Sequence, residues 1–216
     1  MPVTYHIITT GTHTWTKSQK LVGVRDISLD QNGRKQALAA AKYLQNFQMT
    51  EIHYARTTRA AQTYKIIFAQ LFPQQHRQIQ TQVRQSRGAY YSLHKRNSSI
   101  TIPTRRDARL NDINYGSLQG LFPEERETRF TAIWDQFQKD PQHTTFPSGE
   151  SFAAVCTRVQ SYLQQFTVSN LFETHYAVIT HTAIARIIEM LAHKEPPSHF
   201  FNKTYTDGEI IVVECT

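Results

Sequence analysis

The chain of 216 residues has only two cysteines, Cys156 and Cys215, and no apolar run of the roughly 18 residues that a membrane-spanning helix needs. Two thiols without a C-x-x-C spacing exclude a disulfide framework and a cysteine-based zinc site. The amino terminus also lacks the basic segment and apolar run of a secretory signal. We therefore expect a cytoplasmic protein that has no membrane partner and needs neither a metal nor a cofactor.

Acidic residues are scarce relative to basic ones. The 17 Asp and Glu residues face 24 Lys and Arg, which leaves a net charge of +7 and a pI near 9.5. A basic surface attracts phosphorylated metabolites, acidic lipids and nucleic acid alike, so the charge does not select among these ligands. The length suits one large domain over residues 1–216, which can bury about 70% of its unfolded surface.

The apolar pattern predicts strands that alternate with helices. The predicted strands cover residues 3–10, 50–55, about 100–102, 176–180 and 210–214, and the predicted helices follow Asp30 and cover 59–71, 150–166 and 183–192. This alternation predicts an α/β fold of three layers, with a mostly parallel central sheet and helices on both faces. Ligands of such sheets bind beyond the carboxyl ends of the strands, where the following residues fall: Thr9, Thr10, Arg59, His181 and Thr182.

Five blocks of sequence carry a family resemblance. The first is GTHTWT at 11–16 with the stretch 21–37, and the others are HYARTTRAAQT at 53–63, LNDINYGSLQG at 110–120, PSGES at 147–151 and VITHTAIAR at 178–186. In this order they resemble the histidine phosphatase superfamily, which contains the cofactor-dependent phosphoglycerate mutases. The resemblance implies a phosphoglycerate mutase-like fold along most of the chain.

The first block departs from the family pattern at the nucleophile. The family has Arg-His-Gly, and its histidine attacks a phosphoryl group; this chain has Thr9-Thr10-Gly11. A threonine hydroxyl does not attack unless an adjacent base removes its proton, and no base is adjacent to Thr10 in the sequence. His6 and His13 lie four residues before and three after Thr10, so we expect both to be structural. The sequence therefore predicts little or no phosphohistidine turnover.

The resemblance assigns the remaining family functions by position. The acid that protonates the leaving oxygen falls on Asp112, one methylene shorter than the family's Glu, and the second histidine falls on His181. The predicted catalytic positions are thus Asp112, a residual His181, and Thr10 at the place of the nucleophile. The predicted ligand-binding residues are Thr9, Thr10, Gly11, Arg59, Tyr115, His181 and Thr182.

Three functions stay open at this point. The favoured one is a protein that is inactive in phosphohistidine chemistry and binds a phosphorylated small molecule or another anion. The alternative is a slow or altered-mechanism phosphomonoesterase that uses His181 and Asp112. The third is a module that binds nucleic acid or protein through a basic, Gln-rich insertion at about 74–99, although no nucleic-acid motif accompanies it. The sequence leaves the ligand's identity and the oligomeric state open.

Overall fold

The computed structural model describes residues 3–74, 76, 102–166 and 174–215, and its strands form one mixed sheet. In spatial order the strands are β3 (Thr104–Asp107), β2 (Met49–Ala55), β4 (Thr174–Thr180), β1 (Val3–Thr9) and β5 (Ile210–Cys215). The first four run parallel, and β5 runs antiparallel to β1. The predicted, mostly parallel sheet is confirmed.

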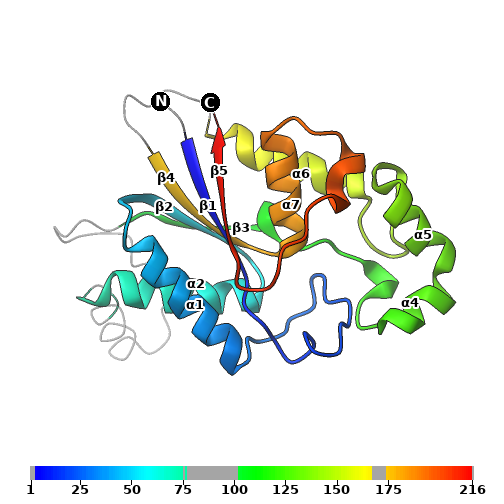
Figure 1. Ribbon diagram of the computed structural model, residues 1–216, viewed down its shortest axis with the longest axis horizontal. Helices are drawn as coiled ribbons and strands as arrows, with labels where there is room; N and C mark the ends of the chain where they lie inside the picture. The colour runs from blue at the N-terminus through cyan, green and yellow to red at the C-terminus, as the bar shows by residue number, and fades with distance from the viewer. Residues whose placement is uncertain (1–2, 75, 77–101, 167–173, 216) are drawn as a thin grey trace, which may run out of the picture.

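Helices cover both faces of this sheet (Figure 1). One face carries α1 (Gln31–Leu44) and α2 (Thr58–Leu71), the other carries α6 (Phe152–Gln164) and α7 (Thr182–Ala192), and the short α4 (Pro123–Arg129) and α5 (Thr131–Lys139) lie to one side. The predicted three-layer α/β arrangement is therefore confirmed. Within the described ranges, no helix is long and apolar enough to cross a membrane.

Local sequence explains where the helices begin. The Asp30 carboxylate accepts the Gly33 amide hydrogen at 2.7 Å and caps α1, as the sequence predicts. The Ser151 hydroxyl caps α6 in the same way, so this helix starts at Phe152, two residues later than predicted. Each helix then buries one apolar stripe against the sheet.

The two central strands determine where a site can form. Every residue of β1 is buried, because helices cover both faces of the sheet. The register of the parallel pair β1 and β4 aligns Thr9 with Thr180, so both strands end at the same edge. The residues that follow, Thr10 and His181, therefore emerge side by side although they are far apart in the sequence.

The strand expected near 100–102 begins later, at Thr104. Residues 100 and 101 lie outside the described residues, and Ile102 precedes the strand. Two isoleucines, Ile100 and Ile102, favour a strand at this place in the sequence, whereas β3 is an edge strand whose exposed Arg105 and Arg106 give no apolar signal. The basic insertion at about 74–99 also lies outside the described residues, apart from 74 and 76, and its role stays a prediction.

His6 is a buried, uncharged histidine in β1. Its Nδ1 lies 3.2 Å from the Tyr43 hydroxyl and its Nε2 lies 3.0 Å from Nδ1 of His175. Burial, and to a lesser extent His175, lowers the pKa of His6 to about 4.

We expect acid to destabilise the fold partly through His6. The pKa of a histidine in the unfolded chain is about 6.5, above that of folded His6, so the unfolded state binds more protons between these values. The free energy of unfolding should therefore fall as the pH drops from about 6.5 towards 4. Urea unfolding at several pH values measures this fall, and His6→Gln should make it shallower. The same change at the exposed His193 should leave it unaltered, and identical pH profiles for all three proteins would refute the assignment.

Candidate functional site

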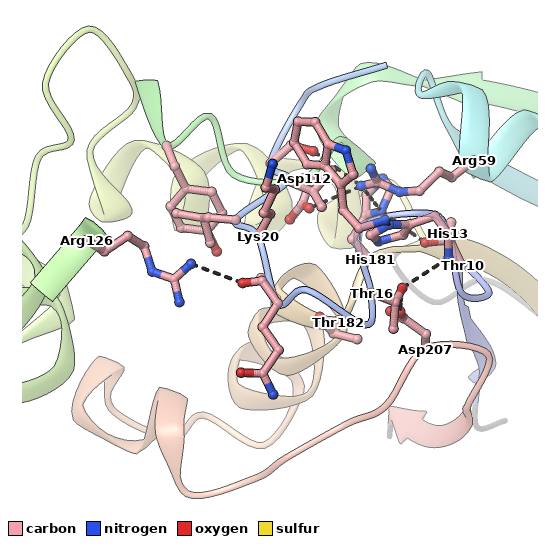
Figure 2. A pocket seen from close by; sticks show the side chains of 17 residues that line it. Thr10, His13, Thr16, Lys20, Arg59, Asp112, Arg126, His181, Thr182 and Asp207 are labelled. Atoms are coloured by element: carbon pink, nitrogen blue, oxygen red, sulfur yellow. Dashed lines mark hydrogen bonds and ion pairs between the residues drawn. The ribbon is translucent and has the colours of Figure 1, made fainter. Parts of the chain in front are cut away.

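A pocket of about 240 Å³ lies at the carboxyl ends of β1 and β4 (Figure 2). Its walls come from the loop after β1, the start of α2, the segment 112–115, α4, the start of α7 and the loop before β5. Ligand pockets usually measure roughly 300–1,000 Å³, so this one suits a small molecule. It lies at the sheet edge that the sequence predicts for the site.

Arg59 provides the main buried charge of the pocket. It lies in the first turn of α2, which Thr57 caps, and only 2% of the residue is exposed. Its Nη2 lies 3.3 Å from the Gly23 carbonyl oxygen, 3.4 Å from Oδ2 of Asp112 and 3.2 Å from Nδ1 of His181. Its Nε has no hydrogen-bond partner among the described residues. Burial lowers the pKa of Arg59, and the Asp112 carboxylate opposes this shift. The Arg59 guanidinium thus still has an N–H group, at Nε, for which no acceptor lies among the described residues.

His181 follows β4, and both of its ring nitrogens have partners within the protein. Because Arg59 can only donate, Nδ1 of His181 must accept, and the proton of the neutral ring then lies on Nε2. That nitrogen is 3.0 Å from the Thr57 hydroxyl oxygen, to which it donates. Burial and the neighbouring Arg59 lower the pKa of His181 well below its usual value of 6.5, so the ring is neutral at pH 7. The neutral ring therefore has no uncommitted lone pair.

Thr10 contacts the same ring nitrogen. Its Oγ1 lies 3.3 Å from Nδ1 of His181, and only 3% of the residue is exposed. The sequence places no base next to Thr10, yet the fold brings one from the other half of the chain. This base is weak, because Nδ1 of His181 also accepts from Arg59 and the pKa of the ring is low.

Asp112 is a buried carboxyl group beside Arg59. Its Oδ1 accepts the Ile113 amide hydrogen at 2.9 Å. Burial raises the pKa of Asp112 to about 6, although Arg59 acts in the opposite direction. The group is therefore partly protonated near pH 6 and can donate a proton there.

Arg158 holds the backbone on which Asp112 lies. Its guanidinium donates to the carbonyl oxygens of Asn111 at 2.8 Å and Asp112 at 3.0 Å, and to Oε2 of Glu150 at 3.1 Å. Glu150 belongs to the PSGES block, so this block acts on the site through Arg158.

Two of the predicted ligand-binding residues do not line the pocket. Successive side chains along a strand point to opposite sides, so Thr9 points away from Thr10. The Thr9 hydroxyl donates to the Thr206 carbonyl oxygen at 2.8 Å and accepts the Glu209 amide hydrogen at 2.8 Å. Gly11 packs so closely on Gly33 that a Cβ atom would lie 2.5 Å from the Gly33 carbonyl oxygen. The pocket is lined by the other predicted residues: Thr10, Arg59, Asp112, Tyr115, His181 and Thr182.

His13 lines the pocket although the sequence indicates only a structural role. Its Nδ1 accepts the amide hydrogen of Trp15 at 3.2 Å, so the neutral ring carries its proton on Nε2. Burial, followed by Arg59, lowers the pKa of His13. In this state Nε2 of His13 can donate a hydrogen bond, and the ring has no uncommitted lone pair. Its distance from Thr10 along the sequence could not reveal this, because the path of the loop decides where the ring points.

The charges of the pocket favour an anion. Three basic side chains, Lys20, Arg59 and Arg126, line it together with the carboxylates Asp112 and Asp207. The carboxylates contribute less than two full charges near pH 6, because the pKa of Asp112 is raised. The pocket therefore carries a net positive charge.

Comparison with known proteins identifies the fold. The family model described as the histidine phosphatase superfamily (branch 1) matches residues 7–84 and 83–216. A 2,3-bisphosphoglycerate-dependent phosphoglycerate mutase of Methanosarcina mazei is 28% identical over 158 residues. This match covers 68% of the present chain and 62% of that enzyme, which is less than two thirds of its length.

Solved structures share the architecture. A mycobacterial glucosyl-3-phosphoglycerate phosphatase superimposes with a TM-score of 0.77 at 15% identity, covering 99% of this chain and 91% of the other. An α-ribazole-5'-P phosphatase from Escherichia coli gives a TM-score of 0.74 at 14% identity, covering 98% and 90%. At these identities the likeness shows that the fold is shared.

We expect the loss of Arg158 to destabilise the protein. Arg158→Met removes one partner of a largely buried ion pair and leaves backbone carbonyl groups without donors, which should cost about 2–3 kcal/mol of the free energy of unfolding. Urea unfolding measures this loss. Arg129→Met is the control, because the side chain of Arg129 is 60% exposed and its pair with Glu125 spans 3.9 Å. Equal losses in the two variants would contradict the role of Arg158.

Proposed function

Since this chain belongs to the histidine phosphatase superfamily, we propose that it binds a phosphorylated small molecule or another anion in this pocket without using phosphohistidine chemistry. This proposal depends on the hydrogen bonds and ring protons of the two histidines that line the pocket, His13 and His181. Nδ1 of His181 accepts from Arg59, and Nδ1 of His13 accepts from the Trp15 amide. In the neutral rings the remaining nitrogens hold protons, so neither ring presents a lone pair to a phosphorus atom.

Donors that suit a phosphoryl group surround the pocket. Arg59 has spare N–H capacity, and the amino terminus of α7 faces the pocket through Thr182 and Ala183. This helix has no acidic residue in its first turn and no side-chain cap, so its first amide hydrogens are not satisfied by a cap. Helix amino termini bind anions through such amides and the helix dipole. An anion at this place would satisfy both sets of donors.

The names of the related proteins agree with this ligand class. The mutase, the glucosyl-3-phosphoglycerate phosphatase and the α-ribazole-5'-P phosphatase are each named for a phosphorylated small molecule. These names support a phosphorylated ligand for the present chain.

Thermal unfolding tests the proposal. At a phosphate-ester concentration about 100 times its Kd, binding stabilises the folded state by about 2.7 kcal/mol, or roughly 5–10 °C for a chain of this length. Arg59→Gln should abolish the shift, because it removes the buried charge. The exposed Arg56, three residues earlier, provides the control: Arg56→Gln should retain the shift. Unchanged melting temperatures with every anion tested would refute the proposal.

One contact favours a second candidate function, a slow phosphomonoesterase. Nδ1 of His181 lies 3.3 Å from the Thr10 hydroxyl, and the pKa of Asp112 is about 6. In this mechanism His181 removes a proton from a water molecule once the bound anion has drawn Arg59 away. The oxygen of this water attacks the phosphorus atom, the P–O bond to the leaving group breaks, and Asp112 protonates the leaving oxygen. The low pKa of His181 makes this reaction slow.

The pH dependence of turnover tests the second candidate. Because the acid must be protonated, kcat/KM for p-nitrophenyl phosphate should rise as the pH falls from 8 through about 6. Asp112→Asn should remove this rise, and His181→Asn should abolish turnover. Absence of turnover in the unmodified protein across this range would eliminate the candidate and leave the binding function.

A further inference from the structure

Asp207 is an acidic residue in a pocket whose other features favour an anion. It lies in the loop before β5 and lines the pocket together with the basic residues Lys20, Arg59 and Arg126. A carboxylate repels a negatively charged ligand unless that ligand donates a hydrogen bond to it. Asp207 therefore influences which anions the pocket accepts.

The turn that carries Asp207 is bonded to the end of β1. The Gly208 amide donates to the Thr10 carbonyl oxygen at 3.1 Å, and the Thr9 hydroxyl donates to the Thr206 carbonyl oxygen at 2.8 Å. The residues on both sides of Asp207 are thus attached to the last residue of the strand and the one after it. These bonds hold the backbone of Asp207 beside Thr10.

Only one oxygen of the Asp207 carboxylate has a partner in the protein. Oδ2 accepts a hydrogen bond from the Thr16 hydroxyl at 2.9 Å, which fixes the orientation of the group. Within the ranges that the structure describes, no residue donates to Oδ1 and none forms an ion pair with Asp207. In Figure 2, Asp207 lies with Thr16, Thr10 and His13 at one end of the pocket, and Arg126 lies at the other. Oδ1 is therefore available to accept a hydrogen bond from a ligand.

Asp207 also acts electrostatically on the charged groups around Arg59. Burial lowers the pKa of Arg59, and Asp112 and then Asp207 oppose this shift. Burial raises the pKa of Asp112 to about 6, and Asp207 adds a smaller contribution in the same direction. An anion at Arg59 therefore faces two carboxyl groups, and each further negative charge on it increases the repulsion.

We propose that Asp207 makes the pocket selective for a phosphoryl group that keeps one proton. The protonated oxygen donates to Oδ1 of Asp207, while the other oxygens accept from Arg59 and the amino terminus of α7. Such an O–H···O⁻ hydrogen bond is stronger than one between neutral groups. This inference rests on the proposed function and specifies its ligand: a singly charged phosphate monoester, and not a sulfate ester, which has no proton to donate near neutral pH.

Methyl phosphate and methyl sulfate provide a matched test by calorimetry at pH 6. The second pKa of a phosphate monoester is about 6, so about half of the methyl phosphate carries a single charge at this pH. This form has the shape and charge of methyl sulfate and differs from it by the proton on one oxygen. We expect methyl phosphate to bind at least about tenfold more tightly, the gain from one charge-assisted hydrogen bond.

The variant Asp207→Asn tests whether Asp207 is the acceptor. An amide keeps the size of the side chain, and it either accepts from a phosphate O–H or donates to a sulfate oxygen. The preference for methyl phosphate should therefore fall to within about twofold. Asp135→Asn is the control, because it removes one charge from an exposed place on α5, and it should keep the tenfold preference. An equal gain in affinity for both esters in Asp207→Asn would reflect net charge alone and would contradict the proposal.

Thr16 provides a second test that leaves Asp207 in place. Thr16→Val removes the hydrogen bond that orients the carboxylate and should reduce the preference about threefold, whereas Thr16→Ser keeps the hydroxyl group and should retain it. Thermal unfolding without ligand establishes that each variant folds. If Asp207→Asn does not fold, the comparison of the two Thr16 variants decides.

Failure of this selectivity differs from failure of the proposed function. If methyl phosphate binds and Arg59→Gln abolishes its binding, but methyl sulfate binds equally tightly, the selectivity is refuted and the proposed function stands. A preference that survives Asp207→Asn refutes the role of Asp207. If no phosphate ester and no sulfate ester binds, the proposed function fails and the selectivity fails with it.

Discussion

The hydrogen bond between Arg59 and His181 determines the chemistry of this pocket. An arginine can only donate, so at 3.2 Å it fixes Nδ1 of His181 as an acceptor and leaves the ring proton on Nε2, which bonds to Thr57. Burial and the arginine's charge keep the ring neutral by lowering its pKa. His181 thereby helps to hold Arg59 in place. A buried cation held by long hydrogen bonds is well prepared to bind an anion.

The parallel sheet brings His181 next to Thr10. Pairing of β1 with β4 aligns Thr9 with Thr180, and the next residue of each strand, Thr10 or His181, turns into the pocket. The register therefore brings a hydroxyl group and an imidazole within 3.3 Å across 171 positions of sequence. A strand that pointed its side chains the opposite way would turn Thr9 instead of Thr10 toward the pocket. Strand alternation therefore decides which of the two threonines lines the pocket.

Charge balance divides the pocket into two parts. Asp112 and Asp207 are engaged with groups near Arg59, whereas Arg126 donates to carbonyl groups and is influenced by Glu124 and Glu127, and Lys20 lies over aromatic rings. Burial of the Arg126 guanidinium costs solvation free energy, which carbonyl groups, the Trp134 ring and nearby acids compensate in part.

The sequence by itself determined the family, the layered α/β fold and six of the residues that line the pocket, because sequence motifs, helix caps such as Asp30, apolar periodicity and the residues at strand ends can be read locally. It misplaced β3, since an edge strand carries polar side chains, and it could not assign His13 or Arg126 to the pocket. Only the tertiary structure decided that Thr9 points away from the pocket, that His181 lies beside Thr10, and which ring nitrogen carries the proton. Orientation and protonation depend on distances between residues remote in the sequence, and the packed fold alone determines these distances.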